Sequence, residues 1–73
     1  MAKKGGNAVY RVTQVIGTSS QSWEDATRNA VKTAAGTLRD LRIAEIEKLD
    51  VKIENGKVTQ FRARLSLSFK YGA

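Results

Sequence analysis

Hydrophobic and polar residues alternate along two stretches of the chain, 41–54 and 57–71. Successive side chains of an extended strand point to opposite faces of a sheet, so this alternation predicts two long strands. Between them lies Asn55-Gly56, a dipeptide that favours a type I′ turn and hence an antiparallel hairpin. Ile46 breaks the alternation of the first stretch, which indicates a bulge or a sharp bend there.

One face of the 57–71 stretch is apolar and the other is polar. The apolar face comprises Phe61, Ala63, Leu65, Leu67, Phe69 and Tyr71, and the polar face comprises Gln60, Arg62, Arg64, Ser66, Ser68 and Lys70. We expect the apolar face to cover a helix. The polar face is expected to be exposed to solvent or to line a cavity.

Apolar residues recur at helical spacing over residues 23–38. This spacing predicts an amphipathic helix, whose alanine-rich stripe lets it approach the sheet closely. Ser22 is a suitable N-cap, and Asp25 three residues later makes a variant of the capping box. Trp23 is expected to anchor the core or an interface. Gly36 predicts either that the helix frays there or that another backbone comes near.

A further strand is predicted over residues 8–16, with a tight turn at residues 17–19. The helix reverses the chain, so the strands over 8–16 and 41–54 point the same way and the last strand fits between them. The predicted fold class is therefore α+β, in the order β-α-β-β, with a three-stranded antiparallel sheet packed on one helix. We expect residues 1–7 to form a flexible tail and residues 8–73 a single domain.

The composition narrows the classes of function. The chain has 73 residues, no Cys and no His, which excludes disulfides and the commonest transition-metal ligand. No apolar run approaches the ~20 residues of a membrane span, so we expect a soluble, cytoplasmic protein without a membrane partner. A core this small supplies little folding stability, so small domains add disulfides, a bound metal or contacts between subunits. Without Cys or His, we expect contacts between subunits, that is oligomerisation, to supply the stability. Since no Ser or Thr has a visible base beside it, we do not expect an enzyme.

The net charge of +6 would suit an anionic partner. Acidic and basic residues are interleaved, however, and no nucleic-acid motif is present. A basic module that binds anions or nucleic acid is therefore kept as the weaker alternative.

Several short motifs, in their order and spacing, resemble those of the dodecin family. They are Tyr10-Arg-Val, Gly17-Thr-Ser, Ser22-Trp-Glu-Asp-Ala, Thr37-Leu-Arg-Asp-Leu and Leu65-Ser-Leu-Ser-Phe-Lys. The resemblance implies a hollow homododecamer in which each sheet wraps partly around its helix. It also implies the family's role, which is to bind and store flavin.

In flavin-binding dodecins a tryptophan near the start of the second strand stacks on the flavin, and a glutamine on the third strand hydrogen-bonds its edge. The matching positions here hold Ile43 and Arg62. Isoleucine lacks an aromatic face, and arginine donates hydrogen bonds without accepting them. The resemblance thus implies an altered pocket and weakened binding of FMN or riboflavin. The candidate cofactor-binding residues are Ile43, Ala44, Glu45, Arg62 and Arg64.

The run Arg42-Ile43-Ala44, together with Arg62, resembles a variant of the family for which calcium is a reported ligand. Calcium is therefore an alternative ligand. The candidate metal-binding residues are Glu45, Glu47, Asp50 and Glu54. One chain offers no clustered calcium motif, so such a site would need carboxylates gathered at a symmetry axis. An assembly without any physiological ligand also stays open.

Overall fold

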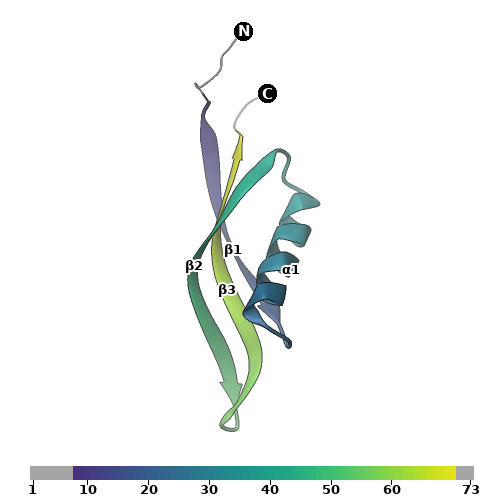
Figure 1. Ribbon diagram of the computed structural model, residues 1–73, viewed down its shortest axis with the longest axis vertical. Coiled ribbons are helices and arrows are strands. Elements are labelled where there is room, and N and C mark those ends of the chain that lie inside the picture. The colour runs from purple at the N-terminus through teal and green to yellow at the C-terminus, as the bar shows by residue number, and fades with distance from the viewer. Residues whose placement is uncertain (1–7, 71–73) are drawn as a thin grey trace.

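The computed structural model of the protein describes residues 8–70. Its elements are β1 (Tyr10–Ser19), α1 (Trp23–Ala35), β2 (Leu41–Glu54) and β3 (Lys57–Lys70). The strands form one antiparallel sheet in the order β1-β3-β2, and α1 covers one of its faces (Figure 1). This confirms the predicted topology. The expected tail, residues 1–7, and the strand position of Tyr71 lie outside the described residues.

Residues 17–19 belong to β1, so the turn predicted there was wrong. They pair with residues 61–63 of β3, and the chain turns only after Ser19. Gly17 has a different role, because a β-carbon there would collide with the backbone oxygen of Ala26 and come within 2.7 Å of the β-carbon of Ala30. Its missing side chain therefore lets α1 lie directly against β1.

Helix α1 begins as predicted and ends earlier. Ser22 is extended, and its hydroxyl oxygen accepts a 3.0 Å hydrogen bond from the backbone N–H of Asp25. The Asp25 carboxylate does not return to Ser22 but accepts from the hydroxyl of Ser19 at 2.7 Å, which ties the helix start to the end of β1. The helix stops at Ala35 with Gly36 as its C-cap, short of the predicted residue 38.

The hairpin between β2 and β3 is formed as predicted. Asn55 and Gly56 have φ values of 53° and 75°, the left-handed conformations that a type I′ turn requires. The pairing register shifts between Ile46 and Lys48, so Glu47 is an extra residue in β2. This bulge explains why Ile46 leaves the alternation of its strand.

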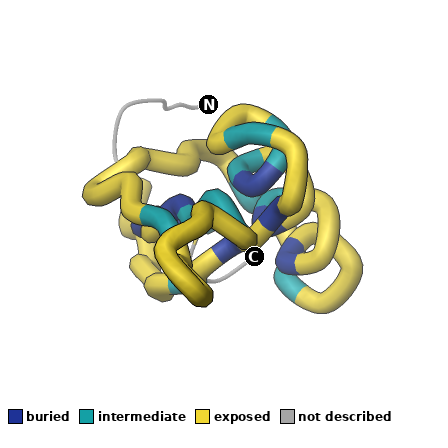
Figure 2. The backbone as a smooth tube through the Cα atoms, turned by 90° about the horizontal axis from the view of Figure 1, so that it is seen from below, coloured by how far each residue is buried: buried dark blue, intermediate teal, exposed yellow. Residues whose placement is uncertain are grey.

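The buried core is small and lies between α1 and β3 (Figure 2). It consists of Ala26, Ala30 and Ala34 from the helix and Ala63, Leu65 and Leu67 from the strand. Many large apolar side chains remain exposed. They are Val9, Tyr10, Val12, Ile16, Trp23, Ile43, Ile46, Leu49, Ile53 and Val58. Among residues 8–70 no helix is both long and apolar enough to cross a membrane.

Candidate functional site

The face of the sheet away from α1, here called the helix-free face, carries most of the predicted site residues. Ile43 pairs with Ser68, and Arg62 pairs with Asp50. The two residues expected to contact one flavin are therefore separated by the stretch of β3 from Arg62 to Ser68, roughly 20 Å at the rise of a strand. One copy of the chain does not bring them together, so a shared pocket would need a second copy. Ala44 pairs with the buried Leu67, which places it on the opposite face from Ile43.

Arg62 is held by a carboxylate of the neighbouring strand. Its Nε donates to Asp50 Oδ1 at 2.7 Å and its Nη2 donates to Asp50 Oδ2 at 3.2 Å. The hydrogen bond from Arg62 holds the pKa of Asp50 below its ordinary value, and the same bond raises the pKa of Arg62. Both oxygens of Asp50 are thus used within the chain.

Trp23 contacts the backbone of Asp50 and the ring of Phe61. Its indole N–H donates to the backbone oxygen of Asp50 at 3.0 Å, and its ring meets that of Phe61 edge to face with centroids 5.2 Å apart. It is therefore a packing anchor that joins the first turn of α1 to β2 and β3, as its interpretation from the sequence proposed.

Glu47, the bulge residue of β2, reaches across the sheet. Its Oε1 accepts from Gln14 Nε2 of β1 at 2.9 Å, and its Oε2 accepts from the hydroxyl of Ser66 on β3. The bond from Ser66 contributes most to holding the pKa of Glu47 below its ordinary value, and the bond from Gln14 comes next. These contacts keep the carboxylate charged and tie the three strands together on the helix-free face.

The four predicted metal-binding carboxylates do not share one place. Glu45 pairs in register with Ser66, and Glu47 accepts a hydrogen bond from the hydroxyl of the same serine, so these two carboxylates neighbour one residue of β3. Asp50 is occupied by Arg62, and Glu54 lies near the hairpin turn, 3.6 Å from the Nζ of Lys52. Within residues 8–70 no three metal-binding side chains come together. Calcium takes six to eight oxygens, so one copy does not complete a calcium site.

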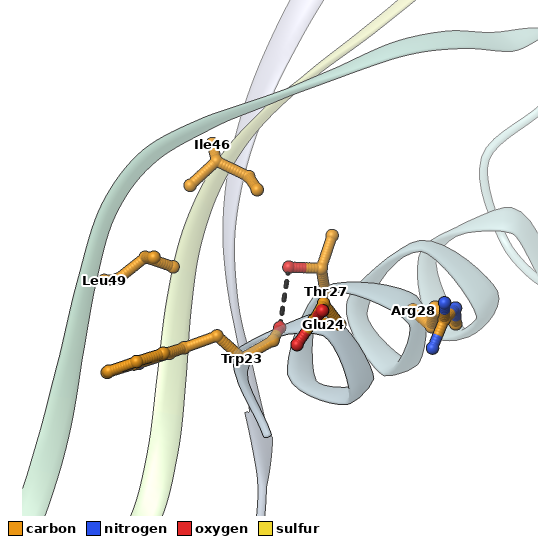
Figure 3. Close-up of a pocket in the computed structure, with 6 residues that line it drawn as sticks. All are labelled: Trp23, Glu24, Thr27, Arg28, Ile46 and Leu49. Carbon is orange, nitrogen blue, oxygen red and sulfur yellow. Dashed lines mark hydrogen bonds between the residues drawn. The ribbon is translucent and has the colours of Figure 1, made fainter.

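A hollow between α1 and β2 was not predicted. It has a volume of about 390 Å³ and is lined by Trp23, Glu24, Thr27, Arg28, Ile46 and Leu49. Figure 3 shows Leu49 of β2 near the ring of Trp23, Ile46 further along the same strand, and Arg28 further along the helix. The hydroxyl of Thr27 donates to the backbone oxygen of Trp23 at 2.9 Å. The hollow is therefore a surface against which apolar groups can pack. The sequence feature that could have predicted it is the break in alternation that places Ile46 and Leu49 on one face.

The sequence model of the family Dodecin matches residues 9–72. The chain belongs to the dodecin family. It is 41% identical over 64 residues to Calcium dodecin of Mycobacterium tuberculosis, an alignment that covers 86% of this chain and 89% of that protein. Dodecins are binding proteins rather than enzymes, and family members form oligomers and bind small ligands.

Solved dodecin structures share this fold. The structure of dodecin from Streptomyces coelicolor matches with a TM-score of 0.87 and 39% identity, covering 94% of this chain and 99% of that one. The calcium dodecin of Mycobacterium tuberculosis, described as calcium chelating with a novel calcium-binding site, matches with a TM-score of 0.79 and 38% identity over 89% of this chain and 93% of that one. These matches confirm the resemblance drawn from the motifs.

Proposed function

We propose that this chain assembles into a non-enzymatic homododecameric shell that binds calcium in preference to flavin. Assembly is supported by the large apolar side chains that one copy leaves exposed, among them Ile16, Ile43 and Ile53. A single core in a chain of this size rarely supplies more than about 3–5 kcal/mol. Contacts between copies would remove this apolar surface from water and add the missing stability.

Weak flavin binding is supported at both positions that the family uses for the flavin ring. Ile43 provides no aromatic face on which a ring can stack. Arg62 directs its Nε and Nη2 donors at Asp50, so those donors are not aimed at a ligand. A flavin would have to compete with this ion pair.

The observation that carries the calcium proposal is that Glu45 and Glu47 of β2 both neighbour Ser66, Glu45 by pairing in register and Glu47 by accepting its hydroxyl hydrogen bond. Hard cations such as calcium prefer carboxylate oxygens, and Glu47 is already held in its charged form. Two carboxylates from one copy supply only part of the six to eight oxygens that calcium takes, and a second copy would supply the rest. The name of the 41% identical relative, Calcium dodecin, adds support.

Isothermal titration of the assembled, chelator-treated protein with calcium chloride and with riboflavin tests this proposal. We expect calcium to bind the shell more tightly than riboflavin does. Glu45→Gln is expected to lower calcium affinity by about tenfold or more, because calcium affinity rises with the number of charged ligands. Glu54→Gln is the matched control on the same strand and should bind as the parent does. Equal calcium affinity in both variants, or tighter binding of riboflavin, would contradict the proposal.

A further inference from the structure

The turn that joins β2 to β3 is exposed and projects beyond α1 (Figure 1). Asn55 and Gly56, the two residues of this turn, have positive φ values and lie outside both strands. A β-carbon built on Gly56 would meet no atom within 4 Å. The backbone at Gly56 is therefore open on the side where a side chain would lie.

Two groups of this turn can react with each other, and neither is engaged in a hydrogen bond. Among residues 8–70, the side-chain amide of Asn55 has no hydrogen-bond partner, and the backbone N–H of Gly56 has none either. The amide carbon of an asparagine side chain is an electrophile, and the nitrogen of the next residue can reach it by closing a succinimide ring. Glycine makes this attack easiest, because no β-carbon shields its nitrogen.

The other asparagine of the described chain is placed differently. Asn29 is also exposed, but it lies within α1, and its Nδ2 donates to the backbone oxygen of Thr18 at 3.1 Å. The next residue is the buried Ala30. Inside a helix the backbone N–H bonds to the carbonyl four residues earlier. Both reacting groups are thus held at Asn29, whereas both are free at the hairpin turn.

We propose that Asn55 is a site of spontaneous deamidation, for which water is the co-reactant. The backbone nitrogen of Gly56 bonds to Cγ of Asn55, loses its proton and expels the side-chain nitrogen as ammonia, which leaves a succinimide. Water then opens the ring at one of its two carbonyl carbons. Opening at Cγ gives aspartate. Opening at the main-chain carbonyl carbon gives isoaspartate, in which the chain continues through Cγ.

The two products change the hairpin in different ways. Aspartate adds a negative charge and keeps the turn, because Asp-Gly favours the type I′ conformation as Asn-Gly does. Isoaspartate adds a carbon to the main chain, so a two-residue turn no longer fits between the paired Glu54 and Lys57. We therefore expect the isoaspartate form to lose the strand pairing next to the turn.

Peptide mass spectrometry of the full-length folded protein, sampled over weeks at neutral and at mildly alkaline pH, tests this site. Trypsin releases Asn55 in a peptide of residues 53–57 and Asn29 in a peptide of residues 29–32, which is the internal control. A sample digested at the start corrects for conversion during digestion. We expect the peptide with Asn55 to gain the mass difference between NH₂ and OH and to separate into aspartate and isoaspartate forms. The gain should be faster at the higher pH, because the attacking nitrogen must lose its proton, and the peptide with Asn29 should stay unchanged.

Gly56→Ala should slow the conversion by about tenfold, because its β-carbon shields the nitrogen and restricts the rotation that ring closure needs. Asn55→Asp supplies the aspartate standard and should keep the circular dichroism spectrum of the parent. The proposal is overturned if the peptide of residues 53–57 gains no mass in the folded protein, if Asn29 converts as fast, or if Gly56→Ala converts at the parent rate. Aspartate without isoaspartate would also overturn it, because direct hydrolysis of the side chain leaves the main chain unchanged.

Discussion

Gly17 of β1 lies so close to the carbonyl oxygen of Ala26 in α1 that a β-carbon at position 17 would overlap that oxygen. Neighbouring Ala30 closes the space from the next turn of the helix. The contact of helix and sheet at this point is therefore one of backbone against backbone. This contact sets the distance between the helix and the strand. That distance determines how tightly the side chains of the small core pack.

Gly17→Ala is expected to destabilise the fold by about 1–3 kcal/mol, because overpacking forces the helix and the strand apart. Urea unfolding followed by circular dichroism measures the loss. Gly36→Ala is the control, since Gly36 has a helical φ of −71° and a new β-carbon would meet only Thr33 O at 3.3 Å. It should be neutral or gain a few tenths of a kcal/mol. Equal losses in the two variants would show that the close approach at Gly17 does not limit packing.

Trp23→Phe is expected to lower the free energy of unfolding by about 1 kcal/mol, because phenylalanine keeps an aromatic ring but loses the hydrogen bond to Asp50. Chemical denaturation followed by far-ultraviolet circular dichroism measures this change. Trp23→Ala, which also loses the contact with Phe61, should cost more. A Phe variant as stable as the parent would assign the role of Trp23 to its ring alone.

Acid is expected to destabilise the protein partly through Glu47. The pKa of this group is lowered in the folded state from an ordinary value of 4.5. Its contribution to stability is thus fully present above about pH 4.5 and is lost as the pH falls through the lower, folded pKa. Urea midpoints measured along a descending pH series should fall less steeply for Glu47→Gln than for the parent. Glu54→Gln serves as the control and should follow the parent curve; identical slopes for Glu47→Gln and the parent would refute this prediction.

Restoring the residues of the family's flavin pocket is expected to restore flavin binding. The double change Ile43→Trp with Arg62→Gln supplies a stacking face and an amide that both donates and accepts. Quenching of riboflavin fluorescence should reveal a gain in affinity over the parent. Ile53→Trp with Arg62→Gln is the matched control, because Ile53 is an equally exposed isoleucine further along β2. No gain in the first variant would mean that the pocket is misplaced.

Because the two pocket positions are separated along β3 within one copy, this gain should depend on assembly. Conditions that dissociate the proposed shell while leaving the secondary structure intact should abolish the gain in flavin affinity. Size-exclusion chromatography and circular dichroism of the same samples check both requirements. Flavin binding by a folded monomer of the double variant would contradict the shared pocket.

Local patterns in the chain were sufficient to predict the elements and their order. Alternation over 41–54 and 57–71 marked two strands, and Asn55-Gly56 marked the turn between them. Ser22 marked the start of the helix. These features act through the backbone preferences of a few adjacent residues, so they can be recognised in the sequence without knowledge of distant contacts.

Residues 17–19 adopt a structure that the local sequence pattern does not predict. A Gly-Thr-Ser run resembles a turn by composition, yet it continues β1 because the pairing with β3 and the contact of Gly17 with Ala26 favour an extended chain. The advantage of glycine at this position comes from a helix that lies several residues away. The steric need for glycine at position 17 follows only from the packing of that helix on the strand.

The contacts of the candidate site depend on two register shifts. A regular ladder from the hairpin turn would set Asp50 opposite Phe61; the shift between Lys52 and Ile53 sets it opposite Arg62 instead. The shift at Glu47 then turns that carboxylate toward Ser66 and Gln14.

The candidate residues were thus named from the chain alone, while the partners that they have within one copy were decided by the folded sheet. A displacement of one position along a strand exchanges its two faces. The break in alternation at Ile46 indicated the bulge beside it, but the alternation is regular across Lys52 and Ile53, so no pattern along that strand records the second register shift.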